Sequence, residues 1–101
     1  MNIGDFVYVY IHDLEKSLSV LKSFREDRFG KITNIQSIQN GKDNILSYDI
    51  LLKNGTTIRY RTDNLTTNII LIADLIELVG RLDVSSDKKR GLLDQLNRIV
   101  F

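Results

Sequence analysis

The residue types that carry most enzyme chemistry are sparse in this chain. His12 is the only histidine, there is no cysteine, and no serine, threonine or lysine stands in a recognisable nucleophile motif. His12 and Asp13 are adjacent, but neighbours at a junction between a strand and a helix point apart. A loop histidine beside a helix-capping aspartate is therefore the favoured interpretation. We predict no catalytic residue.

Metal and cofactor sites are also not indicated. The carboxylates are spread over expected turns and helix surfaces rather than paired, so neither acid–base catalysis nor a metal site gains support from them. The six glycines are isolated, and none belongs to a motif that cradles phosphate. We therefore expect no metal and no cofactor.

One feature that could carry recognition is a row of aromatic side chains. Residues 3–11 alternate as a strand, which puts Phe6, Tyr8 and Tyr10 on one face. Such a face could stack on nucleic-acid bases or hold a side chain of a partner protein. Packing against the core or a helix is the alternative, and it is the more frequent role of such residues.

A second feature is a pair of arginines on the strand expected over residues 56–62. Arg59 and Arg61 share its outer face, and Lys53 precedes the strand. These cations could meet phosphates or an acidic partner. An ordinary solvated face is the alternative interpretation.

The C-terminal region offers a third surface. A helix is expected from about Ser86, its N-cap, to about Val100, with an apolar stripe that includes Leu96 and Ile99. This stripe could dock on the chain's own body or form a homo-oligomer with a second copy. Lys88-Lys89-Arg90 opens the helix, where cations oppose the helix dipole, so these residues serve either solubility or function.

The remaining elements follow from periodicity and turn signals. Asp13 can cap a helix over about residues 14–24, and strands are expected over 31–39, 44–52, 56–62 and 68–72. Asn40-Gly41 marks one turn, and Asn54-Gly55 suits the centre of a type I′ hairpin turn. Residues 72–80 have helical spacing. The short run 68–72 does not separate firmly from a helix.

Composition places the chain among ordinary globular domains. Its 101 residues are 43% hydrophobic and 27% charged, with a net charge of +1, so no overall field draws it to nucleic acid or lipid. No apolar run suggests a membrane span, and the lack of cysteine fits a reducing compartment, so we expect a cytoplasmic protein without a membrane partner. The bias toward Ile, Asn, Lys and Asp hints at a phage or bacterial source.

Four segments resemble small barrels of the Tudor or KOW type. They are Gly4-Asp5-Phe6-Val7-Tyr8-Val9, Phe29-Gly30-Lys31-Ile32, Tyr48-Asp49-Ile50-Leu51-Leu52-Lys53-Asn54-Gly55 and Asp63-Asn64-Leu65. The resemblance covers about residues 3–72 and implies a non-enzymatic module that binds protein segments or nucleic acid. It transfers no ligand-binding position to this sequence.

Together these observations predict one α+β domain spanning residues 1–101. An SH3-like barrel of about five antiparallel strands occupies residues 1–72, with an inserted helix at 14–24, and a helical segment occupies residues 73–101. We expect a small non-enzymatic binding module or accessory factor that acts by protein–protein interaction. The alternative is a nucleic-acid binder that uses the Arg/Lys and Tyr face. An enzyme would need a deep polar pocket with His12 or converging aspartates.

Overall fold

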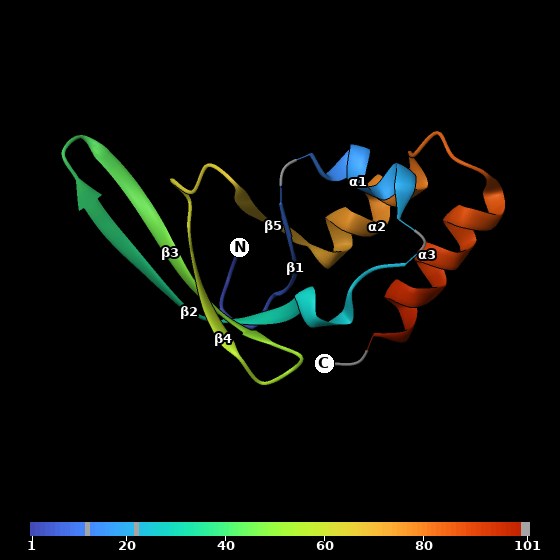
Figure 1. Ribbon diagram of the computed structural model, residues 1–101. Helices are drawn as coiled ribbons and strands as arrows, with labels where there is room; N and C mark the ends of the chain where they lie inside the picture. The colour runs from blue at the N-terminus through green and yellow to red at the C-terminus, as the bar shows by residue number, and fades with distance from the viewer. Residues whose placement is uncertain (12, 22, 100–101) are drawn as a thin grey trace.

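The computed structural model describes residues 1–11, 13–21 and 23–99, and for Asn40 the backbone alone. It is an α+β structure in which a five-stranded antiparallel sheet, of order β4-β3-β2-β1-β5, carries its helices at one end (Figure 1). In chain order the elements are β1 (Phe6–Ile11), α1 (Leu14–Val20), the 3-10 helix η1 (Glu26–Arg28), β2 (Phe29–Asn40), β3 (Asp43–Leu52), β4 (Thr57–Arg61), β5 (Thr67–Leu71), α2 (Ile72–Gly80) and α3 (Ser86–Arg98).

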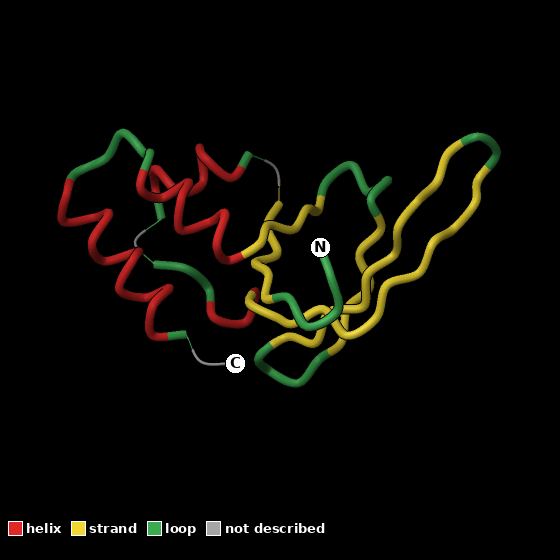
Figure 2. The backbone as a smooth tube through the Cα atoms, turned by 180° about the vertical axis from the view of Figure 1, so that it is seen from behind, coloured by secondary structure: helices red, strands yellow, loops and turns green. Residues whose placement is uncertain are grey.

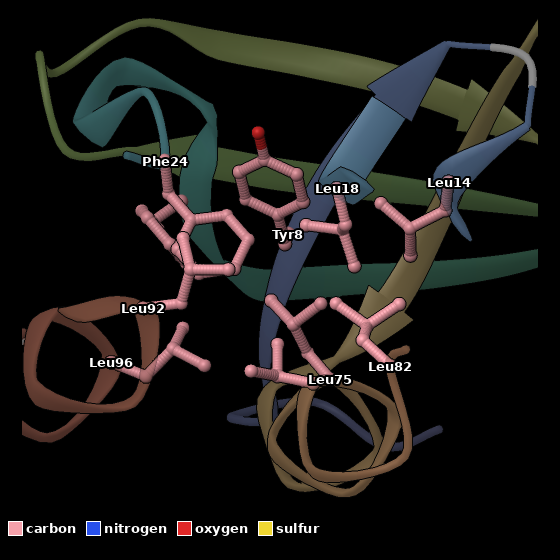
Figure 3. Packing of buried hydrophobic residues seen from close by; sticks show 10 residues of the cluster. Tyr8, Leu14, Leu18, Phe24, Leu75, Leu82, Leu92 and Leu96 are labelled. Carbon is pink, nitrogen blue, oxygen red and sulfur yellow. The ribbon is translucent and has the colours of Figure 1, made fainter. Parts of the chain in front are cut away.

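Strand β1 lies between two apolar clusters, which explains why both of its faces are apolar. Val7 and Val9 point into a cluster formed by the sheet's strands. Tyr8 points the other way, into a cluster shared with the helices. Figure 3 shows the Tyr8 ring between Phe24 and Leu18, with its hydroxyl directed away from Leu75 and Leu82. A strand covered on both sides tolerates no polar face, as its sequence shows.

The apolar stripe of α3 is buried within the chain. Leu92 is fully buried and Leu96 is only 4% exposed, and both pack in the cluster that contains Tyr8, while Ile99 packs against its edge. The stripe therefore docks on the chain's own body. Leu96, a candidate for the homo-oligomer interface, is not accessible to a second copy.

The sheet is not closed, so the predicted barrel is not confirmed. Strands β4 and β5 form the two edges, and within the described residues no backbone pairing joins them. One side-chain contact spans the gap: the Tyr60 hydroxyl donates to Asn68 Oδ1 at 3.0 Å. Thus the sheet curls enough to bring its edges within reach of a tyrosine.

Strands β2 and β3 form a long hairpin that extends away from the helices (Figures 1 and 2). Near its base β2 pairs with β1 over residues 29–31, and β3 pairs with β4 over residues 47–51. Beyond these regions the distal arm, residues 38–45, consists of two strands alone. Gly41, with φ 64°, forms the tight turn at its tip, as predicted from Asn40-Gly41.

Three local predictions are wrong in detail. The helix expected to reach residue 24 ends at Val20, and Leu21 is already extended; the Ser19 hydroxyl donates to Lys16 O, and such serine contacts compete with helix propagation. Ser85, not Ser86, caps α3. At Asn54-Gly55 the turn is displaced by one residue: Gly55 N–H donates to Leu52 O, so Lys53 and Asn54 are central and Gly55 follows with φ 88°.

The cations that open α3 have structural partners. Lys88 Nζ donates to Ser19 O at the end of α1, and Lys89 Nζ donates to Gly80 O at the end of α2, at 3.2 Å. Carbonyl groups at helix C-termini lack intrahelical donors and carry partial negative charge. Lys88 and Lys89 thus cap two other helices, which accounts for cations at an otherwise unfavourable position.

Candidate functional site

The predicted aromatic row does not form one surface. Tyr8 is 5% exposed and packs on Phe24 and Phe29, with ring centroids 5.2 and 4.8 Å away. Phe6 is 36% exposed and borders a hollow of about 250 Å³ with Leu71. Tyr10 is half-buried and borders a different hollow. The three side chains therefore do not act together as a stacking face.

The predicted arginine pair is matched by carboxylates. Arg59 Nε donates to Asp49 Oδ1 at 3.0 Å, and the Arg59 guanidinium holds the pKa of Asp49 below its usual value. Arg61 makes a bidentate contact with Asp63 at 3.1 and 3.0 Å. The Asp49 and Asp63 carboxylates thus balance most of the positive charge of this strand face, which leaves little for a phosphate.

Lys53 and Ile99, both singled out in the sequence, border a hollow of about 440 Å³. Its other lining residues are Ser23, Glu26, Gly91, Gln95 and Arg98. Two of these polar groups are already engaged: Gln95 binds the backbone of Phe24, and Arg98 Nε donates to Asp94 O at 3.2 Å. None of its described lining residues is an aspartate, so the structure places no converging aspartates there.

A smaller hollow, of about 160 Å³, lies where β1, α1 and η1 meet, and we call it the Tyr-Arg hollow. Asp13 caps α1 by accepting from Lys16 N–H at 3.3 Å, which starts the helix where its side chains lie over β1. Leu21, at the end of α1, and Arg25, before η1, are both extended. The hollow is lined by Tyr8, Val9, Tyr10, Ile11, Leu14, Ser17, Leu21, Arg25 and Arg28.

The polar groups of the Tyr-Arg hollow are mainly donors. Arg25 pairs with Asp27 at 2.8 Å, but no carboxylate within the described ranges reaches Arg28. In those ranges the Tyr10 hydroxyl also makes no hydrogen bond, and burial raises its pKa, which keeps it a neutral O–H donor at neutral pH. None of the described residues that line the hollow carries a carboxylate. It therefore offers a guanidinium and a phenol to an external acceptor.

Tyr8 joins this hollow to the core. Burial raises the pKa of Tyr8, whereas a hydrogen bond from the Arg25 backbone and the nearby Arg28 guanidinium act in the opposite direction. The ring is buried in the core cluster, and Arg25 and Arg28 both act on its hydroxyl. Tyr8 thus belongs to both the core and the candidate site.

The arginines of this hollow were interpreted from sequence as part of a solvated run of mixed charge, Arg25-Glu26-Asp27-Arg28. The signal that identifies them is their spacing. In a 3-10 turn, residues i and i+3 eclipse each other, so Arg25 and Arg28 lie on one side. Glu26 instead lines the larger hollow.

The described residues form neither a metal-binding cluster nor a membrane-spanning helix. In the part of the chain that the structure describes, no three histidine, cysteine, aspartate or glutamate side chains gather to hold a metal ion. The helices there are too short or too polar to cross a membrane. His12, considered above as an acid–base or metal residue, lies outside the described residues.

Comparison with protein-family models, curated proteins and solved structures finds no match to this chain. The proposals below therefore depend on the chain's own geometry.

Proposed function

We propose that this chain is a small non-enzymatic binding module that holds a segment of another protein in the Tyr-Arg hollow. The segment has an apolar side chain next to a carboxylate. The observation that carries this proposal is that the Arg28 guanidinium and the Tyr10 hydroxyl, neither of which has a hydrogen-bond or ion-pair partner among the described residues, line one hollow together with Leu14 and Leu21.

The size of the hollow favours a side chain over a cofactor. Small-molecule sites usually enclose about 300–1,000 Å³, whereas this hollow measures about 160 Å³. Leu14 and Leu21 supply an aliphatic surface for one inserted group. Burying such a group is favourable by about 1.5–3 kcal/mol when it is a large apolar side chain.

The donors at the rim favour an acidic partner. A carboxylate can accept two parallel hydrogen bonds from a guanidinium, and Arg28 is only partly exposed, so the contact would be less screened than one on an open surface. The Tyr10 hydroxyl can donate to the same group or to a neighbouring peptide carbonyl. Charge at the rim thus selects the sequence around the inserted side chain.

The fold is consistent with this role. The strand order β4-β3-β2-β1-β5 and the Tyr60–Asn68 contact between the edges support, as a proposal, the resemblance to small barrels that bind protein segments. Fold alone does not determine function. The nucleic-acid alternative is less favoured because Arg59 and Arg61, its expected phosphate contacts, are paired with carboxylates.

The proposal is tested by selecting binders from a displayed library of random peptides on the purified full chain. We expect enriched peptides to combine Asp or Glu with a neighbouring large apolar residue. A synthetic enriched peptide should then bind Arg28→Gln at least about tenfold more weakly, because a hydrogen bond to a charged group contributes about 1.5–3 kcal/mol. Tyr10→Ala should also weaken binding.

Arg81→Gln is the matched control, since Arg81 is exposed and caps α2 rather than lining the hollow. Equal affinities for Arg28→Gln and Arg81→Gln would overturn the proposed site. Salt-sensitive binding of mixed DNA and RNA, with no enriched peptide, would replace the proposal with the nucleic-acid alternative.

A further inference from the structure

The outer edge of β2 is unpaired along most of the hairpin. β1 pairs with β2 only as far as Lys31, and the N-terminal segment occupies Ile32, through Gly4 N–H to Ile32 O at 2.8 Å and Ile32 N–H to Asp5 O at 2.9 Å. A bulge at Thr33 follows. From there to the tip, residues 34–40 pair on one side with β3 and on the other side with none of the described residues; we call them the free β2 edge.

This edge lacks the usual protection against strand addition. Natural sheet proteins guard exposed edges with charged side chains, proline or bulges. Residues 32–41, Ile-Thr-Asn-Ile-Gln-Ser-Ile-Gln-Asn-Gly, contain neither charge nor proline, and the two lysines that flank them, Lys31 and Lys42, lie outside the free β2 edge. Of these devices the segment has only the bulge at Thr33, which lies at the base of the hairpin. A β-strand of this composition is well suited to pair with another strand.

The distal arm is also a marginal structure by itself. A two-stranded ribbon without a third strand or a packed face has little stability in water. Ile45 of β3 is only 6% exposed, but Ile38 of β2, which lies opposite it, is half-exposed. A third strand along β2 would supply backbone hydrogen bonds and would cover Ile38.

From these observations we infer that a second copy of this chain pairs with the free β2 edge, so that two β2 strands lie antiparallel about a two-fold axis. Identical strands can pair in this way with one isologous contact that satisfies both edges. The segment carries no charge, so like residues meet without repulsion. A pairing centred on Ser37, the middle of residues 34–40, engages the whole free β2 edge and places Gln36 opposite Ile38 of the partner.

The shape of the molecule permits this arrangement. The hairpin points away from the helices in both views (Figures 1 and 2), so antiparallel pairing of two arms places the two helical bodies at opposite ends. The other edge of the arm is less suitable. β3 is paired with β4 up to Ser47, and Thr62 contacts Leu46, which leaves β3 free only near the tip.

This interface is distinct from the α3 stripe considered in the sequence, because Leu92 and Leu96 are buried inside the chain. It is also independent of the Tyr-Arg hollow, which lies between β1, α1 and η1. Failure of one proposal therefore leaves the other unaffected.

The absence of cysteine gives a direct test, because any single cysteine introduced into the full chain is the only thiol present. Cβ atoms of directly opposed residues in a sheet lie about 4.5–5.5 Å apart, close enough for a short thiol cross-linker. We expect Ser37→Cys to form a covalent dimer rapidly. Thr57→Cys, exposed on β4, should form no covalent dimer under the same conditions.

Light scattering after size-exclusion chromatography should show a dimer for the unmodified chain. Ser37→Lys should raise the dissociation constant at least about tenfold, since it places two cations directly opposite each other. Asn44→Lys is the matched control: it is on the same arm and also removes the Ser37–Asn44 hydrogen bond, but it lies on β3. Circular dichroism would verify that each variant keeps its strands.

Two results would overturn the inference. One is a monomer at all concentrations up to about 1 mM, the weak end of measurable association, with no Ser37→Cys cross-link. The other is a dimer that Ser37→Lys leaves intact and Ser37→Cys does not cross-link, which would show that the copies meet elsewhere.

Discussion

The side-chain amide of Gln95 is hydrogen-bonded twice to the backbone of Phe24. Phe24 N–H donates to Gln95 Oε1 at 2.7 Å, and Gln95 Nε2 donates to Phe24 O at 2.8 Å, across 71 positions of sequence. The amide thus satisfies both backbone polar groups of Phe24, as a neighbouring strand would do in a sheet. It links α3 to Phe24, the residue before Arg25, and Arg25 lines the Tyr-Arg hollow.

Replacement of Gln95 by leucine should destabilise the fold. Two hydrogen bonds are lost and a partly buried backbone N–H and C=O remain without partners, so we expect the free energy of unfolding to fall by about 1–3 kcal/mol. Urea titration measures this change. Asn97→Ala, on an exposed position of the same helix, should change it by less than about 0.5 kcal/mol. Equal effects of the two substitutions would show that the Gln95 contact is not structural.

Gly30 and Gly91 should respond to alanine in opposite directions. A Cβ at Gly30 would lie 2.6 Å from Ile50 Cγ2 and 2.8 Å from Leu51 O, so Gly30→Ala should cost about 1–3 kcal/mol through overpacking. A Cβ at Gly91 meets nothing within 4 Å, and the residue is in the interior of α3. Gly91→Ala should stabilise by about 0.5–1 kcal/mol. This account would be contradicted if both variants raised the thermal midpoint of unfolding, or if both lowered it.

The Tyr60–Asn68 contact should couple the two edge strands. Tyr60→Phe keeps the ring that stacks on Tyr48, with centroids 6.1 Å apart, and removes only the hydroxyl donor. We expect a loss of about 0.5–1.5 kcal/mol in the free energy of unfolding. In a double-mutant cycle with Asn68→Ala, the double variant should lose less free energy of unfolding than the sum of the two single losses. Strict additivity would indicate that β4 and β5 do not interact.

Alkaline pH should destabilise the fold through its buried tyrosines. Burial raises the pKa of Tyr8 above the ordinary value of 10.0, and burial acts likewise on Tyr10 and Tyr60. The unfolded chain therefore ionises first, so this stability is complete below pH 10.0 and is lost as the pH rises from there through the folded-state pKa.

Denaturant titrations at several values between about pH 8 and pH 11 measure this effect. Tyr8→Phe retains the ring but cannot ionise, so its stability should fall less steeply with pH. An identical slope for the original chain and Tyr8→Phe would remove Tyr8 from this explanation.

Much of the fold follows from local signals. The alternation from Phe6 to Ile11 and the helical spacing from Ile72 to Gly80 predict elements that the structure confirms. The short run at 67–71 is a strand because it pairs with β1 along its whole length, a tertiary contact that periodicity alone does not reveal. The early end of α1 is likewise accompanied by tertiary contacts, since Phe24 binds Gln95 of α3 and packs on Tyr8.

The site was predicted less well than the fold. Alternation correctly put Tyr8 and Tyr10 on one face of β1, but only packing determines that Tyr8 enters the core while Tyr10 borders a hollow. The ion pairs of Arg59 with Asp49 and of Arg61 with Asp63 depend on cross-strand register and on a turn. Lys88 and Lys89 bind carbonyl groups of α1 and α2, which no pattern within α3 indicates.

The most direct test of the central claim, that the Tyr-Arg hollow binds an acidic apolar segment, is chemical-shift mapping by NMR. Uniformly labelled full chain would be titrated with a peptide enriched in the library selection. We predict that the largest amide shifts cluster at residues 8–11, 14–21 and 25–28, and that they are lost in Arg28→Gln while the folded spectrum persists. Shifts centred on β4, on the distal arm or on the larger hollow around Lys53 and Arg98 would contradict the claim.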